Sequence, residues 1–185
     1  QIPALEHNQK TRATHSHYDP GGTGVNVGRA LEKLNANSHT CLIIAGKMGE
    51  FLETLLTQEL KHISTLKIAG ETRINTTILQ QSPKKQYEVN AAGPSITPSQ
   101  LKKISDRFLS LCGSGIGILT GSLPPGIPDS SYQRINTALQ NQGGRSIIDA
   151  PVSTLKHTLS SKPFLIKPNQ HELEILQNKK LTTIE

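Results

Sequence analysis

Tryptophan is absent from the 185 residues of this sequence, and other aromatic residues are few, with three phenylalanines and three tyrosines. The core must therefore be built mainly from leucine, isoleucine and valine, which suits packed layers of sheet and helix. Only two cysteines occur, Cys41 and Cys112, and both lie in or beside apolar runs. We expect two buried thiols rather than a disulfide framework. Together with the lack of a signal peptide at the start, this indicates a cytoplasmic protein.

Long hydrophobic runs and blocks of like charge are also missing. No apolar stretch approaches the roughly 20 residues of a membrane span, so we expect no membrane partner. The net charge is +6, but basic residues are scattered, and the longest basic runs are pairs such as Lys84-Lys85. Such an excess fits small anionic ligands as well as nucleic acid, and no aromatic or arginine-rich segment favours nucleic acid. The histidines show no metal-ligand spacing, so we assign none to a metal.

What the sequence contains is an alternation of short apolar runs and helical patterns. Apolar runs at 41–45, 116–120, 146–148 and 164–166 indicate strands buried on both faces, as in parallel sheets. Helical spacing occurs from Val25, after Gly49, from Thr97, from a cap at Asp129 and from Asn169. The segments 72–79 and 86–91 carry polar residues on one side, which predicts a hairpin outside the main sheet. We therefore predict one α/β domain with a largely parallel sheet.

Three loops of this pattern could hold a ligand. Gly21-Gly22-Thr23-Gly24-Val25-Asn26 precedes a helix, where glycines and free N–H groups admit anionic atoms, although a plain turn explains it equally well. The loop 121–126 follows a strand end, where ligands collect in open α/β sheets, but a rigid proline-rich connector has the same composition. Lys167 and Glu172 place a cation and a carboxylate at another strand end, which suits phosphate and Mg²⁺. Asn169 with Glu172 is also a capping-box pattern.

The order of these motifs resembles the PfkB (ribokinase-like) carbohydrate kinases, most closely their phosphofructokinase and tagatose-6-phosphate kinase branch. The succession is Y-D-P-G-G-T-G-V-N-V-G-R-A-L, T-R-I-N, N-A-A-G-P, T-G-S-L-P-P-G, I-I-D and K-P-N-Q-H-E-L, over about residues 10–182. The resemblance implies a Rossmann-type three-layer fold with a small β-lid, truncated at both ends. A first strand with a sugar-binding Asp belongs before Gln1, and the G-A-G-D segment with the catalytic base belongs beyond Glu185. It therefore implies no catalytic residue within this chain, which would be a partial kinase domain over 1–185.

The resemblance also implies roles for particular residues. Those expected to bind the sugar phosphate are Gly21, Gly22, Gly24, Asn26, Arg73, Lys10 and Ser122. Among them, Arg73 of T-R-I-N would hold the existing phosphate and Lys10 would be a second phosphate ligand. Those expected to bind Mg-ATP are Lys167, Asn169 and Glu172, the last two as the N-x-x-E motif that organises Mg²⁺ indirectly. The hairpin within 72–91 resembles the lid, through which such kinases pair as homodimers.

The function implied is ATP-dependent phosphoryl transfer to a ketohexose phosphate: fructose 6-phosphate, fructose 1-phosphate or tagatose 6-phosphate. Thr23 stands where many members carry Lys, which leaves the choice of sugar open. One alternative is a truncated, non-catalytic remnant that only binds ligand or dimerises. Others are a ribokinase-like sugar or nucleoside kinase of another branch and a basic nucleic-acid-binding domain. Arg73 and N-A-A-G-P favour the phosphosugar branch over a nucleoside kinase.

Overall fold

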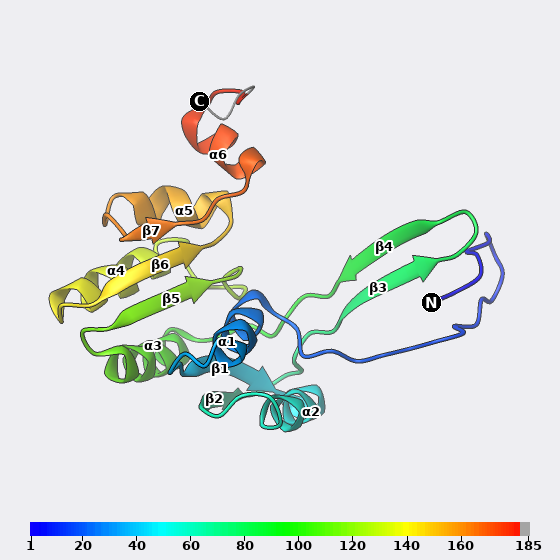
Figure 1. The fold of residues 1–185 in the computed structure, drawn as a ribbon, viewed down its shortest axis with the longest axis horizontal. Helices are drawn as coiled ribbons and strands as arrows, with labels where there is room; N and C mark the ends of the chain where they lie inside the picture. Colours follow the sequence, from blue (N-terminus) through cyan, green and yellow to red (C-terminus); the bar gives the residue numbers. More distant parts are fainter. Residues whose placement is uncertain (182–185) are drawn as a thin grey trace.

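The strands of this protein fall into two parallel sheets and one hairpin (Figure 1). The computed structural model describes residues 1–181. Two strands, β1 (Thr40–Ala45) and β2 (Ile63–Ile68), pair in parallel from Thr40↔Ile63 to Ala45↔Ile68. The second parallel sheet has the order β5 (Ile116–Thr120), β6 (Arg145–Asp149), β7 (Leu165–Ile166). The antiparallel hairpin consists of β3 (Asn75–Gln80) and β4 (Lys85–Asn90). The predicted α/β class is confirmed.

Six helices within the described residues pack on the parallel sheets. They are α1 (Thr23–Lys33), α2 (Gly46–Leu56), α3 (Pro98–Cys112), α4 (Ser131–Asn141), α5 (Val152–Leu159) and α6 (Gln170–Gln177). Both α1 and α3 contact β1 and also β5, so they connect the two sheets. In contrast, α2 packs on both strands of the first sheet, and α4 lies on β6 and against α3 and α5. None of the helices between residues 1 and 181 is both long and apolar enough to cross a bilayer.

Each parallel sheet has its own apolar core, as its aliphatic composition requires. Leu119, Ile148 and Leu155 form the buried centre of one core, between the second sheet and helices α4 and α5. Val25 and Leu56 centre the other, which joins α1 and α2 to the first sheet. Burial of this apolar area is the main stabilising contribution, since each fully buried aliphatic side chain contributes about 1.5–3 kcal/mol.

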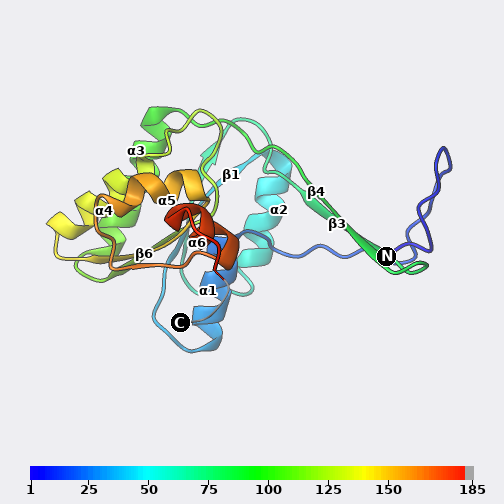
Figure 2. The same ribbon diagram turned by 90° about the horizontal axis from the view of Figure 1, so that it is seen from above.

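The hairpin and the N-terminal arm project together from the body of the protein, as Figure 2 shows. Ile2 adds a short parallel bridge to Gln80, with its N–H donating to Leu79 O at 3.0 Å and its carbonyl accepting from Gln81 N at 3.0 Å. Both Ile2 and Gln80 are buried, although most of the hairpin is exposed. An isolated two-stranded hairpin is only marginally stable, and the arm supplies part of the missing contacts.

Several local predictions were incomplete. Strand β2 and helix α5 were not predicted, because neither has a clear apolar period: β2 is half-buried along its length, and α5 buries two threonines beside Leu155. The second helix begins at Gly46, not after Gly49. Both cysteines are free but only half-buried, so the expectation of buried thiols was wrong in degree.

Helix capping was predicted correctly at one helix and wrongly at another. Thr97 caps α3 as predicted, in a capping box with Gln100. Asp129 does not cap α4, which starts after Ser130 without a side-chain cap. The Asp129 carboxylate instead accepts a hydrogen bond from Thr154 Oγ1 at 3.1 Å, because α5 packs against this corner.

Candidate functional site

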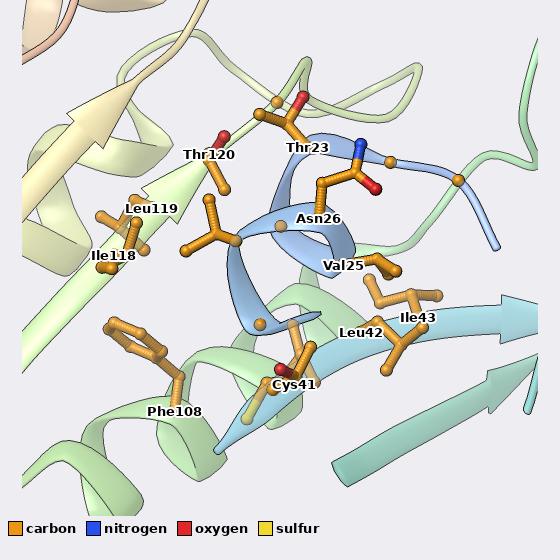
Figure 3. A pocket seen from close by; sticks show the side chains of 18 of the residues that line it. Thr23, Val25, Asn26, Cys41, Leu42, Ile43, Phe108, Ile118, Leu119 and Thr120 are labelled. Atoms are coloured by element: carbon orange, nitrogen blue, oxygen red, sulfur yellow. The ribbon is translucent and has the colours of Figure 1, made fainter. Parts of the chain in front are cut away.

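A hollow of about 1490 Å³ lies between the two parallel sheets. Strands β1 and β5 form two of its walls, and helices α1 and α3 form the others. Within the described residues β1 pairs only with β2 and β5 only with β6, so each strand leaves one edge open beside the hollow. Figure 3 shows the apolar side chains of Val25, Leu42, Phe108 and Ile118 among those that line it. Polar groups gather at one end, around the start of α1.

The glycine loop forms this polar end through the backbone of α1. Gly22 is the N-cap at φ 109°, a conformation that favours glycine, and it has no side chain to cap the helix. The first intrahelical bond runs from Asn26 N to Gly22 O at 2.9 Å, so the amides just before it have no helical acceptor. Gly21, Gly22, Gly24 and Asn26 all line the hollow. A helix start with free N–H groups suits polar or anionic atoms.

The loop after β5 closes the same end of the hollow and brings Ser122 to it. Gly121, at φ 91°, donates its N–H to Asp149 O at 2.9 Å, which ties the loop to the end of β6. The hydroxyl of Tyr132 donates hydrogen bonds to two carbonyl oxygens at the start of this loop, Thr120 O at 3.0 Å and Gly121 O at 3.3 Å. Burial raises the pKa of Tyr132 to about 12, so its hydroxyl stays a donor at neutral pH. Thr120 Oγ1 is buried and has no hydrogen-bond partner among residues 1–181.

Arg73 brings the positive charge to the hollow. It is the only lysine or arginine among the lining residues within 1–181, and no ion pair is recorded for it there. Among the residues that the structure describes, Asp19 supplies the only carboxylate of the lining, and its Oδ1 lies 3.1 Å from His17 Nε2. An exposed guanidinium that lines the hollow suits a phosphate, because it donates from a planar fork.

The residues predicted to bind the nucleotide lie elsewhere, at the end of β7 and the start of α6. The capping-box interpretation holds there: Glu172 N donates to Asn169 Oδ1 at 2.9 Å, and Asn169 N donates to Glu172 Oε2 at 2.8 Å. Lys167 Nζ lies 3.4 Å from Asp149 Oδ1. None of the three predicted residues lines the hollow.

Lys10 is also away from the hollow. It belongs to the N-terminal arm, which bonds to the hairpin through Ile2 and through Pro3, whose carbonyl accepts from Ser82 N at 3.0 Å. The structure therefore brings together six of the seven predicted sugar-phosphate ligands and leaves out Lys10. Its assigned role stays a prediction.

Two contributors to the site were missed by sequence reasoning. Tyr132 lies in α4, where its spacing predicts only an apolar helix face. Glu71 precedes the T-R-I-N motif, and its carboxylate contacts the start of α2. Both residues bond to partners distant in the sequence, so no local sequence pattern predicts their contribution.

Known proteins resemble this chain over most of its length. It is 33% identical to "1-phosphofructokinase" of Bacillus subtilis over 173 residues, covering 92% of this chain and 56% of that protein. It is 30% identical to "ATP-dependent 6-phosphofructokinase isozyme 2" of Escherichia coli over 181 residues, covering 97% and 59% respectively. The chain therefore spans less than two thirds of the length of these relatives.

Solved structures of phosphofructokinase-2 are similar to this chain over nearly its whole length. Phosphofructokinase-2 from Escherichia coli, in complex with substrates and products, superposes with a TM-score of 0.92 at 30% identity, over 99% of this chain and 60% of that one. A structure titled as its tetrameric inhibited form has a TM-score of 0.89, with the same identity and coverage. The family described as pfkB family carbohydrate kinase matches residues 2–185, which confirms the resemblance seen in the motifs. With the family's pattern extending over nearly every residue and the glycine loop, Arg73 and Ser122 around one hollow, the chain belongs to the pfkB family of carbohydrate kinases.

Proposed function

We propose that this chain forms the sugar-binding part of a kinase that transfers the γ-phosphoryl group of ATP to a hydroxyl of a ketohexose phosphate. The observation that carries the proposal is the hollow in which Arg73, the start of α1 and the Ser122 loop face one space. In this reading Arg73 holds the phosphate that the sugar already carries, while Asn26 and the glycine loop hold its hydroxyl groups. The names of two relatives, 1-phosphofructokinase and ATP-dependent 6-phosphofructokinase, support both the acceptor class and ATP as donor.

The choice of sugar depends on where the phosphate lies relative to the reacting hydroxyl. Fructose 6-phosphate, fructose 1-phosphate and tagatose 6-phosphate are the candidates, and the relatives' names include both 1- and 6-phosphofructokinases. Thr23 contributes a hydroxyl rather than a cation beside the loop, so Arg73 is left as the cation of the described lining. We propose that Ser122 lies beside the reacting end of the sugar, because its loop follows the end of β5.

The nucleotide side is proposed at Lys167, Asn169 and Glu172. Glu172 Oε2 accepts from Asn169 N, while Oε1 has no recorded partner among the described residues. No cluster of three or more His, Cys, Asp or Glu side chains suited to a metal occurs within 1–181. This fits Mg²⁺ held mainly by nucleotide phosphates, with one protein carboxylate oxygen, as is usual for that ion. When bound, Mg²⁺ neutralises the charge that develops on the transferred phosphoryl group.

We further propose that 1–185 are part of one kinase domain that pairs as a homodimer through the β3–β4 hairpin. The hairpin exposes Leu79, Tyr87 and Val89 at 40%, 37% and 59% of their surfaces. Such apolar side chains on a marginally stable hairpin favour a covering partner. The tetrameric form of the Escherichia coli phosphofructokinase-2 supports self-association in general.

The proposal is tested by titrating the chain calorimetrically with the three sugar phosphates and with fructose as the unphosphorylated control. We expect at least one sugar phosphate to bind at least tenfold more tightly than fructose, because Arg73 contacts only the phosphate. A folded chain that binds none of the three would overturn the proposal.

A coupled assay of ATP consumption then separates catalysis from binding. A chain that binds the sugar phosphate but consumes no ATP acts as a binding module, which is the alternative of a non-catalytic remnant.

A further inference from the structure

The segment that carries Arg73 has no regular secondary structure, yet it is bonded closely to the first sheet. It lies between β2 and β3, so no strand pairing orders it directly. Thr72 makes two bonds to Ala45 at the end of β1: its N–H donates to Ala45 O at 2.8 Å, and its Oγ1 accepts from Ala45 N at 2.8 Å. The residue just before Arg73 is therefore fixed at the end of β1.

Glu71 adds a second attachment, at the start of α2. Its Oε1 accepts from Lys47 N at 3.2 Å and its Oε2 from Met48 N at 3.2 Å. These are the second and third residues of α2, the amides that a capping side chain ordinarily reaches. The N-cap residue of α2 is Ala45, which makes no side-chain cap bond. Glu71 therefore caps the helix from 23 and 24 residues away in the sequence.

The start of α2 has the shape that this attachment requires. Gly46 has φ +60°, and a Cβ built on it would overlap the Glu71 carboxylate. Gly49 faces Thr72 in the same way, because a Cβ there would lie 2.9 Å from Thr72 Oγ1. Two glycines thus leave room for the two residues that precede Arg73.

We propose that Glu71 is a positioning residue for phosphate recognition: it fixes the backbone of Arg73 at the rim of the hollow by capping α2. This inference rests on the proposed role of Arg73. An exposed arginine on a mobile segment loses side-chain and backbone entropy on binding. Bonds from Glu71 and Thr72 restrict that freedom before the ligand arrives, so binding costs less. The same carboxylate also lies at the positive end of the helix dipole, which favours it there.

The test compares Glu71→Ala with Glu50→Ala. Glu50 is the matched control because it removes the same charge from the same helix end, where its partner is Lys47 Nζ at 2.9 Å rather than a backbone amide. We expect Glu71→Ala to weaken binding of fructose 6-phosphate about fivefold, with fructose binding unchanged. Glu71→Gln keeps an acceptor oxygen and should recover part of the loss, whereas Glu50→Ala should change neither ligand.

A double-mutant cycle with Arg73→Ala separates positioning from a general loss of structure. If Glu71 acts through Arg73, the substitution of Glu71 has no further effect on affinity once Arg73 is alanine. An equal loss in both backgrounds, or the same loss for fructose, would overturn the proposal.

Amide hydrogen exchange provides a readout that needs no ligand. We expect faster exchange at Lys47, Met48 and Thr72, whose N–H groups are hydrogen-bonded, in Glu71→Ala but not in Glu50→Ala. If the unmodified chain binds no sugar phosphate, the proposed function fails, and exchange alone then decides whether Glu71 orders this segment. Unchanged exchange at these amides would reject the attachment itself.

Discussion

The two ends of the proposed reaction site use their polar groups differently. At the sugar side Asn26, Arg73 and Ser122 line the hollow, and no side-chain hydrogen bond or ion pair is recorded for them within residues 1–181. At the nucleotide side Asn169 and Glu172 bond to each other's backbone, and Lys167 pairs with Asp149. One set of motif residues is therefore free for a ligand, whereas the other is already engaged in capping α6 and in the ion pair with Asp149. Substitutions should therefore affect affinity at the first end and stability at the second.

The largest effect is expected for Arg73→Ala. Its guanidinium is exposed and carries no recorded ion pair, so its loss should leave the free energy of unfolding unchanged. Affinity for the sugar phosphate should fall about ten- to a hundredfold, the usual value of a charged hydrogen bond. Calorimetric titration and urea denaturation measure the two quantities, with Arg12→Ala, exposed in the arm, as the control. A loss of stability equal to the loss of affinity would contradict the comparison.

The comparison is sharpest for the matched pair Asn169→Ala and Asn26→Ala. Removing the Asn169 cap of α6 should lower the free energy of unfolding by about 1 kcal/mol, and Asn169→Ser should restore most of it. Asn26→Ala should not lower stability, because alanine is a better helix former than asparagine, and should instead weaken sugar-phosphate binding. Thermal and urea denaturation measure the stability of each variant, and calorimetric titration measures its binding. If Asn26→Ala lowers the free energy of unfolding more than Asn169→Ala does, the expected division between affinity at one end and stability at the other is wrong.

Substitution of Tyr132 shows how much the loop after β5 depends on the hydrogen bonds of its hydroxyl. Tyr132→Phe removes the donor to the Thr120 and Gly121 carbonyls, which should cost about 1 kcal/mol of stability. It should also loosen the loop that carries Ser122, measured as faster exchange of the Gly121 amide, which donates to Asp149 O. Tyr18→Phe is the control, since Tyr18 is 62% exposed and no hydrogen bond of its hydroxyl is recorded. Equal effects of the two variants would argue against a supporting role.

The smallest effect is expected from His39, which lines the hollow just before β1 and is not one of the predicted ligands. Desolvation, followed by the charges of Arg107 and His62, lowers the pKa of His39 below its usual value of about 6.5. The unfolded chain then binds the proton more readily, so His39 makes stability fall as pH drops below about 6.5. His39→Gln should flatten this part of the curve of unfolding free energy against pH, whereas His7→Gln in the exposed arm should not. A slope that is unchanged by His39→Gln would refute this.

Much of the local structure could be predicted from the sequence. The capping box at Asn169, the Thr97 cap and the strand at 116–120 follow from patterns of a few residues, and the structure contains all three. The weakly patterned β2 and α5 escaped prediction, because tertiary packing rather than local preference determines them. The sugar-side residues were named by motif, but only the fold shows that they face one hollow, without Lys10.

By itself, the sequence determined the α/β class, the family and the identity of most candidate ligands, because these depend on periodicity and on motifs that few residues encode. The tertiary structure decided which motif residues remain free for a ligand and which are engaged by their own helix. It also decided that Glu71 caps α2 and that Tyr132 supports the loop at Gly121. The physical reason is that these bonds join residues 11 to 24 positions apart. Their formation depends on how the helices pack on the sheets, which no short pattern records.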